Sequence, residues 1–201
     1  MAKISEKQLK RDKIKIINQL KKNADKSIND IAKTCGFSRQ KVWRIVKDLE
    51  KEKTIWGYTS IVDEAKKGMG YYILLLKRNT IPIKSDVIKT ISSRGIEKHI
   101  EKLGCEFVSS LYTHGSYDWV IIFTAPDKIQ AKKVNEIFID RYHDYIVEIK
   151  LLETIFPVKI QGFVNPNIKN LHDLFWFFMK NNAKKFNIKL RISSFFLNVS
   201  Y

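Results

Sequence analysis

The chain has 201 residues, 44% of them hydrophobic, and its 37 Lys and Arg against 21 Asp and Glu give a formal net charge of +16. This length suits two small domains, and we expect no membrane span, because no run of about eighteen apolar residues is present. Two cysteines, Cys35 and Cys105, exclude a disulfide framework, and an N-terminus without the apolar core of a signal peptide predicts a cytoplasmic protein.

The positive charge is denser toward the N-terminus. Residues 1–67 hold about 18 basic and 9 acidic groups, so this third of the chain is more basic per residue than the rest. A protein of this charge is expected to have a polyanionic partner. The alternative is a lysine-rich, solvated surface, and composition alone leaves both open.

Three short helices are predicted in the first 52 residues. The first covers residues 8–22, and its apolar positions are Leu9, Ile16, Ile17 and Leu20. The second follows its N-cap Ser27 and ends at Gly36. The third follows its N-cap Ser38 and runs to about Glu52, and its expected buried positions are Val42, Ile45, Val46 and Leu49.

The second and third helices fit a helix-turn-helix. This motif needs a small residue where the helices approach, a glycine in the turn and an apolar residue that locks the second helix. Ala32, Gly36 and Val42 fill these roles. With Ile31 and Ile45, five constrained positions agree with the motif.

The third helix is expected to present its polar face to DNA. Gln pairs bidentately with adenine and Arg with guanine in the major groove, whereas Lys and helix N-termini suit phosphates. The expected DNA-binding residues are Ser27, Ser38, Arg39, Gln40, Trp43, Arg44 and Lys47. An ordinary polar surface is the alternative, and Trp43 either contacts sugar and methyl groups or packs under a wing.

A wing and a domain boundary are predicted next. Aromatic and β-branched residues from Ile55 to Val62 favour a strand, and Gly57 permits a bend. The Lys- and Gly-rich stretch 66–70 marks the boundary. We expect a winged helix-turn-helix domain over residues 1–67, a second domain over 68–166 and a tail of uncertain structure over 167–201.

The second domain is expected to be α+β, with the βαββαβ order of the ferredoxin-like fold. Strands are predicted at residues 71–77, 106–113, 117–124 and 145–156. One helical stretch begins at Ser85 and is interrupted at Gly95, and another follows Asp127. In the tail, residues 171–180 and 186–201 are expected to add a helix and a strand that pack on this domain or on a partner, and a disordered end is the alternative.

The sequence resembles the Lrp/AsnC (feast/famine) family of transcriptional regulators over about residues 8–160. That family has S-x-x-x-V in its reading helix, then L-E and I-x-G-Y-T, and later a G-x-Y-D hairpin. The matching residues are Ser38, Val42, Leu49, Glu50, Ile55, Gly57, Tyr58, Thr59, Gly115, Tyr117 and Asp118. Ile45 and Lys53 depart from the usual arginine and glycine, so base contacts are not carried over. The segment FPVKIQGFVNP and the residue bias suggest an archaeal branch.

The resemblance implies a sequence-specific DNA-binding regulator with a C-terminal domain of the RAM or ACT type. It also implies a homodimer, assembly to tetramers or octamers, and an amino-acid-like effector near the G-x-Y-D turn. The implied effector-binding residues are His114, Gly115, Ser116, Tyr117 and Asp118. Judged by chemistry alone, Gly115 allows close backbone approach and Asp118 suits an ammonium group, or the two simply make and cap the turn.

Two other functions stay open. Relatives with this layout act as sirohaem decarboxylases, but the chain has no evident Ser/His/Asp set, metal-ligand spacing or phosphate loop, so we expect no enzyme activity, cofactor or metal. An architectural DNA-packaging protein without an effector is favoured by the net charge and opposed by the base-reading face. The expected partners are double-stranded DNA, further copies of the chain and a small molecule.

Overall fold

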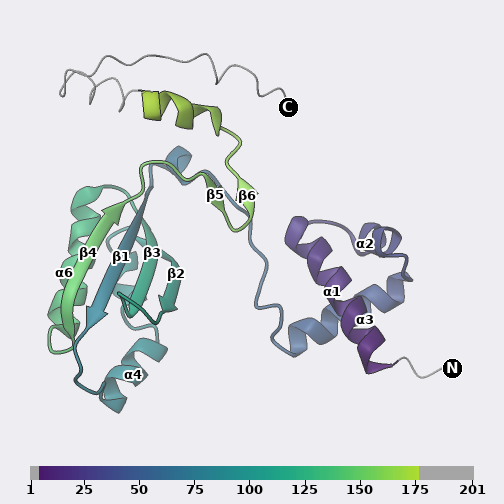
Figure 1. Ribbon diagram of the computed structural model, residues 1–201, viewed down its shortest axis with the longest axis horizontal. Coiled ribbons are helices and arrows are strands. Elements are labelled where there is room, and N and C mark those ends of the chain that lie inside the picture. The colour runs from purple at the N-terminus through teal and green to yellow at the C-terminus, as the bar shows by residue number, and fades with distance from the viewer. Residues whose placement is uncertain (1–4, 177–201) are drawn as a thin grey trace. The chain divides into compact units, whose positions relative to one another are not determined.

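The computed structural model describes residues 5–176, which divide between Ser60 and Ile61 into two units (Figure 1). Each unit has a hydrophobic core of its own. Within the described part, no helix is long and apolar enough to cross a membrane.

The first unit contains three helices, as predicted: α1 (Glu6–Lys22), α2 (Ile28–Cys35) and α3 (Arg39–Lys51). Each begins after a serine whose hydroxyl accepts a hydrogen bond from the backbone N–H three residues further on, and these N-caps are Ser5, Ser27 and Ser38. Gly36 ends α2 with a φ of 70°, a left-handed conformation that glycine adopts without strain.

The core of this unit joins all three helices. It consists of Ile16, Ile31, Ala32, Val42, Ile45, Val46 and Leu49. The predicted buried face of α3 is therefore confirmed. The prediction for α1 is wrong at Leu9, which is 37% exposed, whereas Asp12 is fully buried. Asp12 precedes Ile16 by one helical turn, so both side chains lie on the inner face of α1.

The strand predicted over residues 55–62 is wrong. This segment forms no strand and pairs with no other in residues 5–176. Ile55 packs partly on the core, but the next residue, Trp56, is 93% exposed. Strand-forming residues are not sufficient here, because a strand also needs an adjacent edge that satisfies its backbone N–H and C=O groups.

The second unit is built on a four-stranded antiparallel sheet with the order β2-β3-β1-β4. The strands are β1 (Gly70–Arg78), β2 (Glu106–Tyr112), β3 (Trp119–Ala125) and β4 (Ile146–Glu153). A short 3-10 helix η1 (Glu64–Lys67) precedes them, and the helices are α4 (Ser85–Ser92), α5 (Glu97–Glu101) and α6 (Lys128–Tyr142). This confirms the predicted α+β fold, with the first helical stretch split around Gly95.

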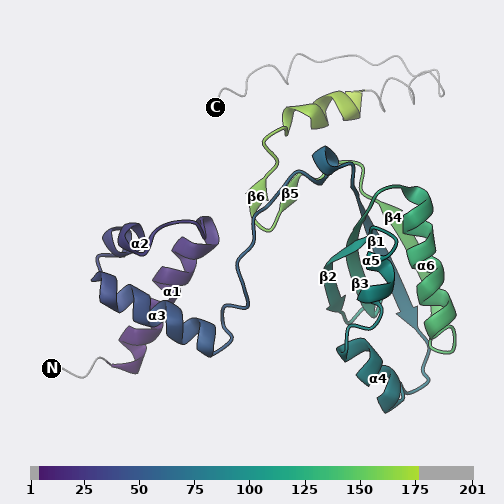
Figure 2. The same cartoon turned by 180° about the vertical axis from the view of Figure 1, so that it is seen from behind.

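Helices α4, α5 and α6 lie on one face of this sheet (Figure 2). Side chains alternate along a strand, so every second residue of β1 points into the core between the sheet and the helices. That core includes Tyr72, Leu74, Leu76, Trp119, Ile121, Phe123, Val134 and Phe138.

The chain continues differently from the prediction after the sheet. Strand β4 ends at Glu153 rather than Phe156, and β5 (Lys159–Ile160) and β6 (Phe163–Val164) form a two-stranded ribbon that was not predicted. Gln161 and Gly162 connect the two strands with φ angles of 47° and 94°, as a two-residue hairpin turn requires. Residues 169–176 are helical. The strand expected over residues 186–201 lies outside the described residues.

Candidate nucleic-acid interface

The outer face of α3 is exposed and polar, as predicted. Its exposed members are Arg39, Gln40, Trp43, Arg44 and Lys47. A shallow hollow on this face is lined by Ser38, Arg39, Gln40, Lys41, Trp43 and Arg44. Trp43 is 57% exposed, so in the described part of the chain it does not pack under a wing. The structure thus brings the expected α3 residues together on one open surface.

The N-termini of α2 and α3 differ in charge. The Ser27 hydroxyl accepts a hydrogen bond of 3.1 Å from the Asp30 N–H and donates one of 2.7 Å to the Asp30 carboxylate. A negative charge therefore already lies at the start of α2. The Ser38 hydroxyl accepts from the Lys41 N–H at 3.2 Å, and no acidic residue lies in the first turn of α3. The positive end of the α3 dipole is thus the better of the two places for a phosphate.

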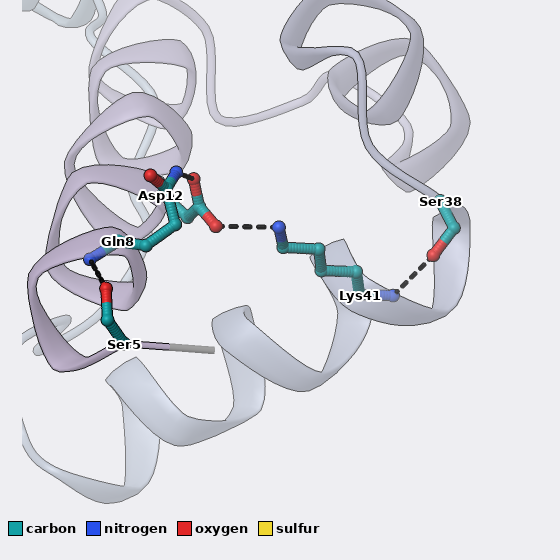
Figure 3. A network of polar contacts seen from close by, with 5 residues as sticks. All are labelled: Ser5, Gln8, Asp12, Ser38 and Lys41. Carbon is teal, nitrogen blue, oxygen red and sulfur yellow. Dashed lines mark hydrogen bonds and ion pairs between the residues drawn. The ribbon is translucent and has the colours of Figure 1, made fainter. Parts of the chain in front are cut away.

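Behind the α3 face lies an ion pair between a half-buried lysine and a buried carboxylate (Figure 3). Lys41 Nζ is 2.6 Å from Asp12 Oδ2, and the Gln8 side-chain amide donates a hydrogen bond of 2.8 Å to Asp12 Oδ1. Lys41 Nζ also lies 4.2 Å from the centre of the Phe37 ring. The Lys41 ammonium holds the pKa of the Asp12 carboxyl below its usual range, although burial opposes this shift.

Neither Asp12 nor Lys41 belonged to the expected site. The only signal in the sequence is the spacing of Asp12, one turn before Ile16 on the apolar stripe of α1. The partner of Asp12 lies 29 residues further along the chain, and local periodicity carries no information about such a contact.

A second group of polar side chains lies at the end of α3. Lys47 Nζ is 2.8 Å from Glu50 Oε2, and the Tyr58 hydroxyl donates a hydrogen bond of 3.0 Å to Glu50 Oε1. The hydrogen bond from Lys47, and to a smaller extent the one from Tyr58, lowers the pKa of the Glu50 carboxyl. Burial, and to a smaller extent the hydrogen bond to Glu50, raises the pKa of Tyr58. Lys47 is therefore paired, and Tyr58 ties the segment after α3 to the helix.

The hairpin between β2 and β3 holds the expected effector residues. His114, Gly115 and Ser116 are exposed, whereas Tyr117 and Asp118 are half-buried. Asp118 fixes the base of the hairpin: its Oδ2 accepts a hydrogen bond of 2.8 Å from the Arg78 N–H, and its own N–H donates one of 2.9 Å to Leu76 O. Lys150 Nζ lies 5.5 Å from the centre of the Tyr117 ring. The five residues lie together in this hairpin, and one carboxylate oxygen of Asp118 already accepts the hydrogen bond from the Arg78 N–H.

The face of the sheet opposite the helices is apolar at its centre, and the ion pair of Lys150 with Glu148 lies on the same face. Residues that are directly opposite each other on neighbouring strands lie on the same face, so the strand register identifies the central residues. Ile73 is opposite Ile122 and Leu152, and Leu75 is opposite Val120. Leu111 and Leu152 on this face are 52% and 44% exposed. Within residues 5–176, α4, α5 and α6 leave this face uncovered (Figures 1 and 2).

Comparison with known proteins gives a family match for the first unit and structural matches that cover both units. Residues 12–55 match a family model described as winged helix-turn-helix DNA-binding. No curated protein sequence matches the chain. Among solved structures, PH0061 is similar over 81% of this chain and 100% of its own, with 21% identity and a TM-score of 0.63. An AsnC family transcriptional regulator from Agrobacterium tumefaciens is similar over 78% of this chain and 97% of its own, with 17% identity and a TM-score of 0.58.

The chain has the two-domain AsnC fold. A transcriptional regulator from Neisseria meningitidis, solved as a complex with L-Met, has it as well: it is similar over 82% of this chain and 97% of its own, with 14% identity and a TM-score of 0.55. These likenesses extend through both units of the AsnC fold. The first unit therefore has a helix-turn-helix fold, which residues 12–55 share with a family described as winged helix-turn-helix DNA-binding, and the second has the fold of the sheet domain in these structures.

Proposed function

We propose that this protein is a sequence-specific, DNA-binding transcriptional regulator of the Lrp/AsnC type that acts in the cytoplasm. The observation that carries the proposal is the exposed α3 face, on which Arg39, Gln40 and Arg44 surround one hollow of a helix-turn-helix. The N-terminal half of the second helix of this motif meets base edges in the major groove. Trp43 adds an aromatic surface that contacts the sugars and thymine methyl groups of DNA. Ser38 is the N-cap of α3, whose N-terminus binds a DNA phosphate. Lys47 contacts a DNA phosphate after its ion pair with Glu50 breaks. Ser27, the N-cap of α2, lies at the start of the first helix of the motif and contacts phosphate there.

The proposed regulator is a homodimer that assembles through its second domain, over residues 68–166. The uncovered sheet face supports this, because a contiguous apolar surface that includes Ile73, Leu75 and Leu111 is unfavourable in water. Stacking two such faces removes both from solvent, as in a two-sheet sandwich. A dimer would present two α3 helices to one duplex, with residues 1–67 as the DNA-binding domain of each copy.

An amino-acid-like effector is proposed at the β2–β3 hairpin. Its residues would be His114, Gly115, Ser116, Tyr117 and Asp118, with the second carboxylate oxygen of Asp118 facing the effector's ammonium group. The support comes from the grouping of these side chains and from the related regulator that was solved with L-Met. An archaeal branch of the family stays a prediction.

Selection of bound duplexes from a random pool tests the proposal. A regulator with two α3 helices should enrich one motif with two half-sites about one helical turn, or roughly 10 base pairs, apart. A pool that binds without enrichment would instead support an architectural protein, which the net charge of +16 also allows.

A further inference from the structure

Asp12 is the only charged residue that is fully buried among residues 5–176. Burying a carboxylate is strongly unfavourable unless it is paired and hydrogen-bonded. Both of its oxygens have partners, Gln8 on the same helix and Lys41 on α3. The pair thus joins α1 to the first turn of the helix that is proposed to read DNA.

The position of Lys41 is unusual for a lysine on a DNA-binding helix. It lies between Gln40 and Arg44 and lines the same hollow, yet its side chain points across to α1 (Figure 3). The side chain is only 25% exposed and is held between the Asp12 carboxylate and the Phe37 ring. Released from this contact, a lysine at the edge of such a face would reach backbone phosphates, which carry no sequence information.

We propose that Asp12 is a positioning residue that withholds Lys41 from DNA phosphates and thereby lowers the sequence-independent affinity for DNA and its dependence on salt. This inference rests on the proposed DNA-binding function. A phosphate cannot recruit Lys41 in the native protein, because breaking the pair would leave a buried carboxylate without its counter-charge. Recognition then depends on the neighbouring Arg39, Gln40 and Arg44, whose contacts to base edges vary with sequence.

The test compares Asp12→Asn with the wild-type full-length protein on a preferred duplex and on a scrambled duplex, across a series of salt concentrations. Asparagine keeps the size of the side chain and a hydrogen-bonding partner for Gln8, but removes the charge that holds Lys41. We expect tighter binding to both duplexes alike, an unchanged preference ratio, and a plot of log K against log salt that is steeper by about 0.9.

Glu52→Gln is the matched control. It changes the net charge by the same amount and also breaks a contact with α1, because Lys13 Nζ lies 2.7 Å from Glu52 Oε1. The Glu52 side chain is 51% exposed, so losing its charge leaves no buried group unpaired, and Lys13 lies on α1 rather than on the proposed reading helix. We expect the salt slope of this variant to equal that of the wild type.

A second variant keeps the proposal testable if Asp12→Asn does not fold. Replacing the pair by apolar residues, Asp12→Leu with Lys41→Met, is compatible with folding in many buried ion pairs. Since Lys41 is withheld in the wild type, we expect this double variant to keep the wild-type salt slope and preference ratio. A slope shallower by about 0.9 would show that Lys41 already contacts phosphate and would overturn the inference. An unchanged slope in folded Asp12→Asn would overturn it as well, whereas absence of DNA binding by the wild type would refute the proposed function itself.

Discussion

The backbone N–H of Arg78 donates a hydrogen bond of 2.8 Å to Asp118 Oδ2, which fixes the end of β1 to the hairpin that is the proposed effector site. Asp118 therefore has a structural contact in addition to any contact with an effector. The two roles use different properties of the side chain: the first needs only an oxygen acceptor, and the second needs the negative charge.

Asp118→Asn and Asp118→Ala separate these roles. Asparagine retains an acceptor for the Arg78 N–H, so we expect it to change the free energy of unfolding little, whereas alanine leaves that N–H unpaired and should lower it by about 1–3 kcal/mol. Asp118→Asn should also abolish the effect of L-Met on DNA affinity. Denaturant unfolding and DNA titrations with and without L-Met measure both; an L-Met response that survives in Asp118→Asn would argue against the effector site.

Substitution of Gly36 tests the geometry of the helix-turn-helix turn, and the same substitution at Gly57 is its control. An added Cβ meets no atom within 4 Å at either position, but only Gly36 has a left-handed φ, of 70°. Gly36→Ala should therefore lower the free energy of unfolding by about 1–2 kcal/mol through backbone strain alone. Gly57→Ala should be close to neutral. Equal losses in denaturant unfolding would contradict the turn geometry.

Ile73 tests the dimer. It lies at the centre of the uncovered sheet face, opposite Ile122 and Leu152, so Ile73→Glu would bury a carboxylate between two stacked sheets. We expect sedimentation velocity at micromolar concentration to show a dimer for the wild type and a monomer for this variant. The control is Ile129→Glu, at a position on α6 that is 67% exposed, and it should remain dimeric. Dimers of both variants would exclude this sheet face as the interface.

The lowered pKa of Asp12 predicts how stability depends on pH. A carboxyl whose pKa is lower in the folded than in the unfolded state stabilises the fold above the unfolded value, about 3.9, and this contribution is lost as pH falls through the folded value. The difference in melting temperature between wild type and Asp12→Asn should therefore be constant above about pH 5 and shrink toward pH 3. A difference that grows on acidification would contradict the assigned direction.

Local chemistry in the sequence was enough to predict much of this fold. Val42, Ile45, Val46 and Leu49 repeat at the helical period, and the serine N-caps and Gly36 mark where helices begin and end, so α2 and α3 were predictable. The fold of the sheet domain was predictable in the same way, from the alternation of apolar residues along its strands and from the order of its elements.

What the sequence did not reveal depends on contacts between distant residues. The pairing of Asp12 with Lys41 and the exposure of Leu9 are set by how α1 packs on α3. Residues 55–62 have the composition of a strand but no adjacent edge to pair with in the described residues. The ribbon of β5 and β6 was missed because only Gly162 is typical of a two-residue turn, whereas Gln161 is not a residue that usually adopts a positive φ.

The most direct test of sequence-specific reading by α3 is a set of binding titrations across salt on a selected and a scrambled duplex. Gln40→Ala and Arg44→Ala should each lose about 1–3 kcal/mol on the selected duplex and little on the scrambled one, because their contacts are to base edges. Lys47→Ala should weaken both duplexes alike and reduce the salt slope by about 0.9, as expected for one phosphate contact. Equal losses on both duplexes for Gln40→Ala and Arg44→Ala would contradict specific reading and indicate an architectural DNA-binding protein.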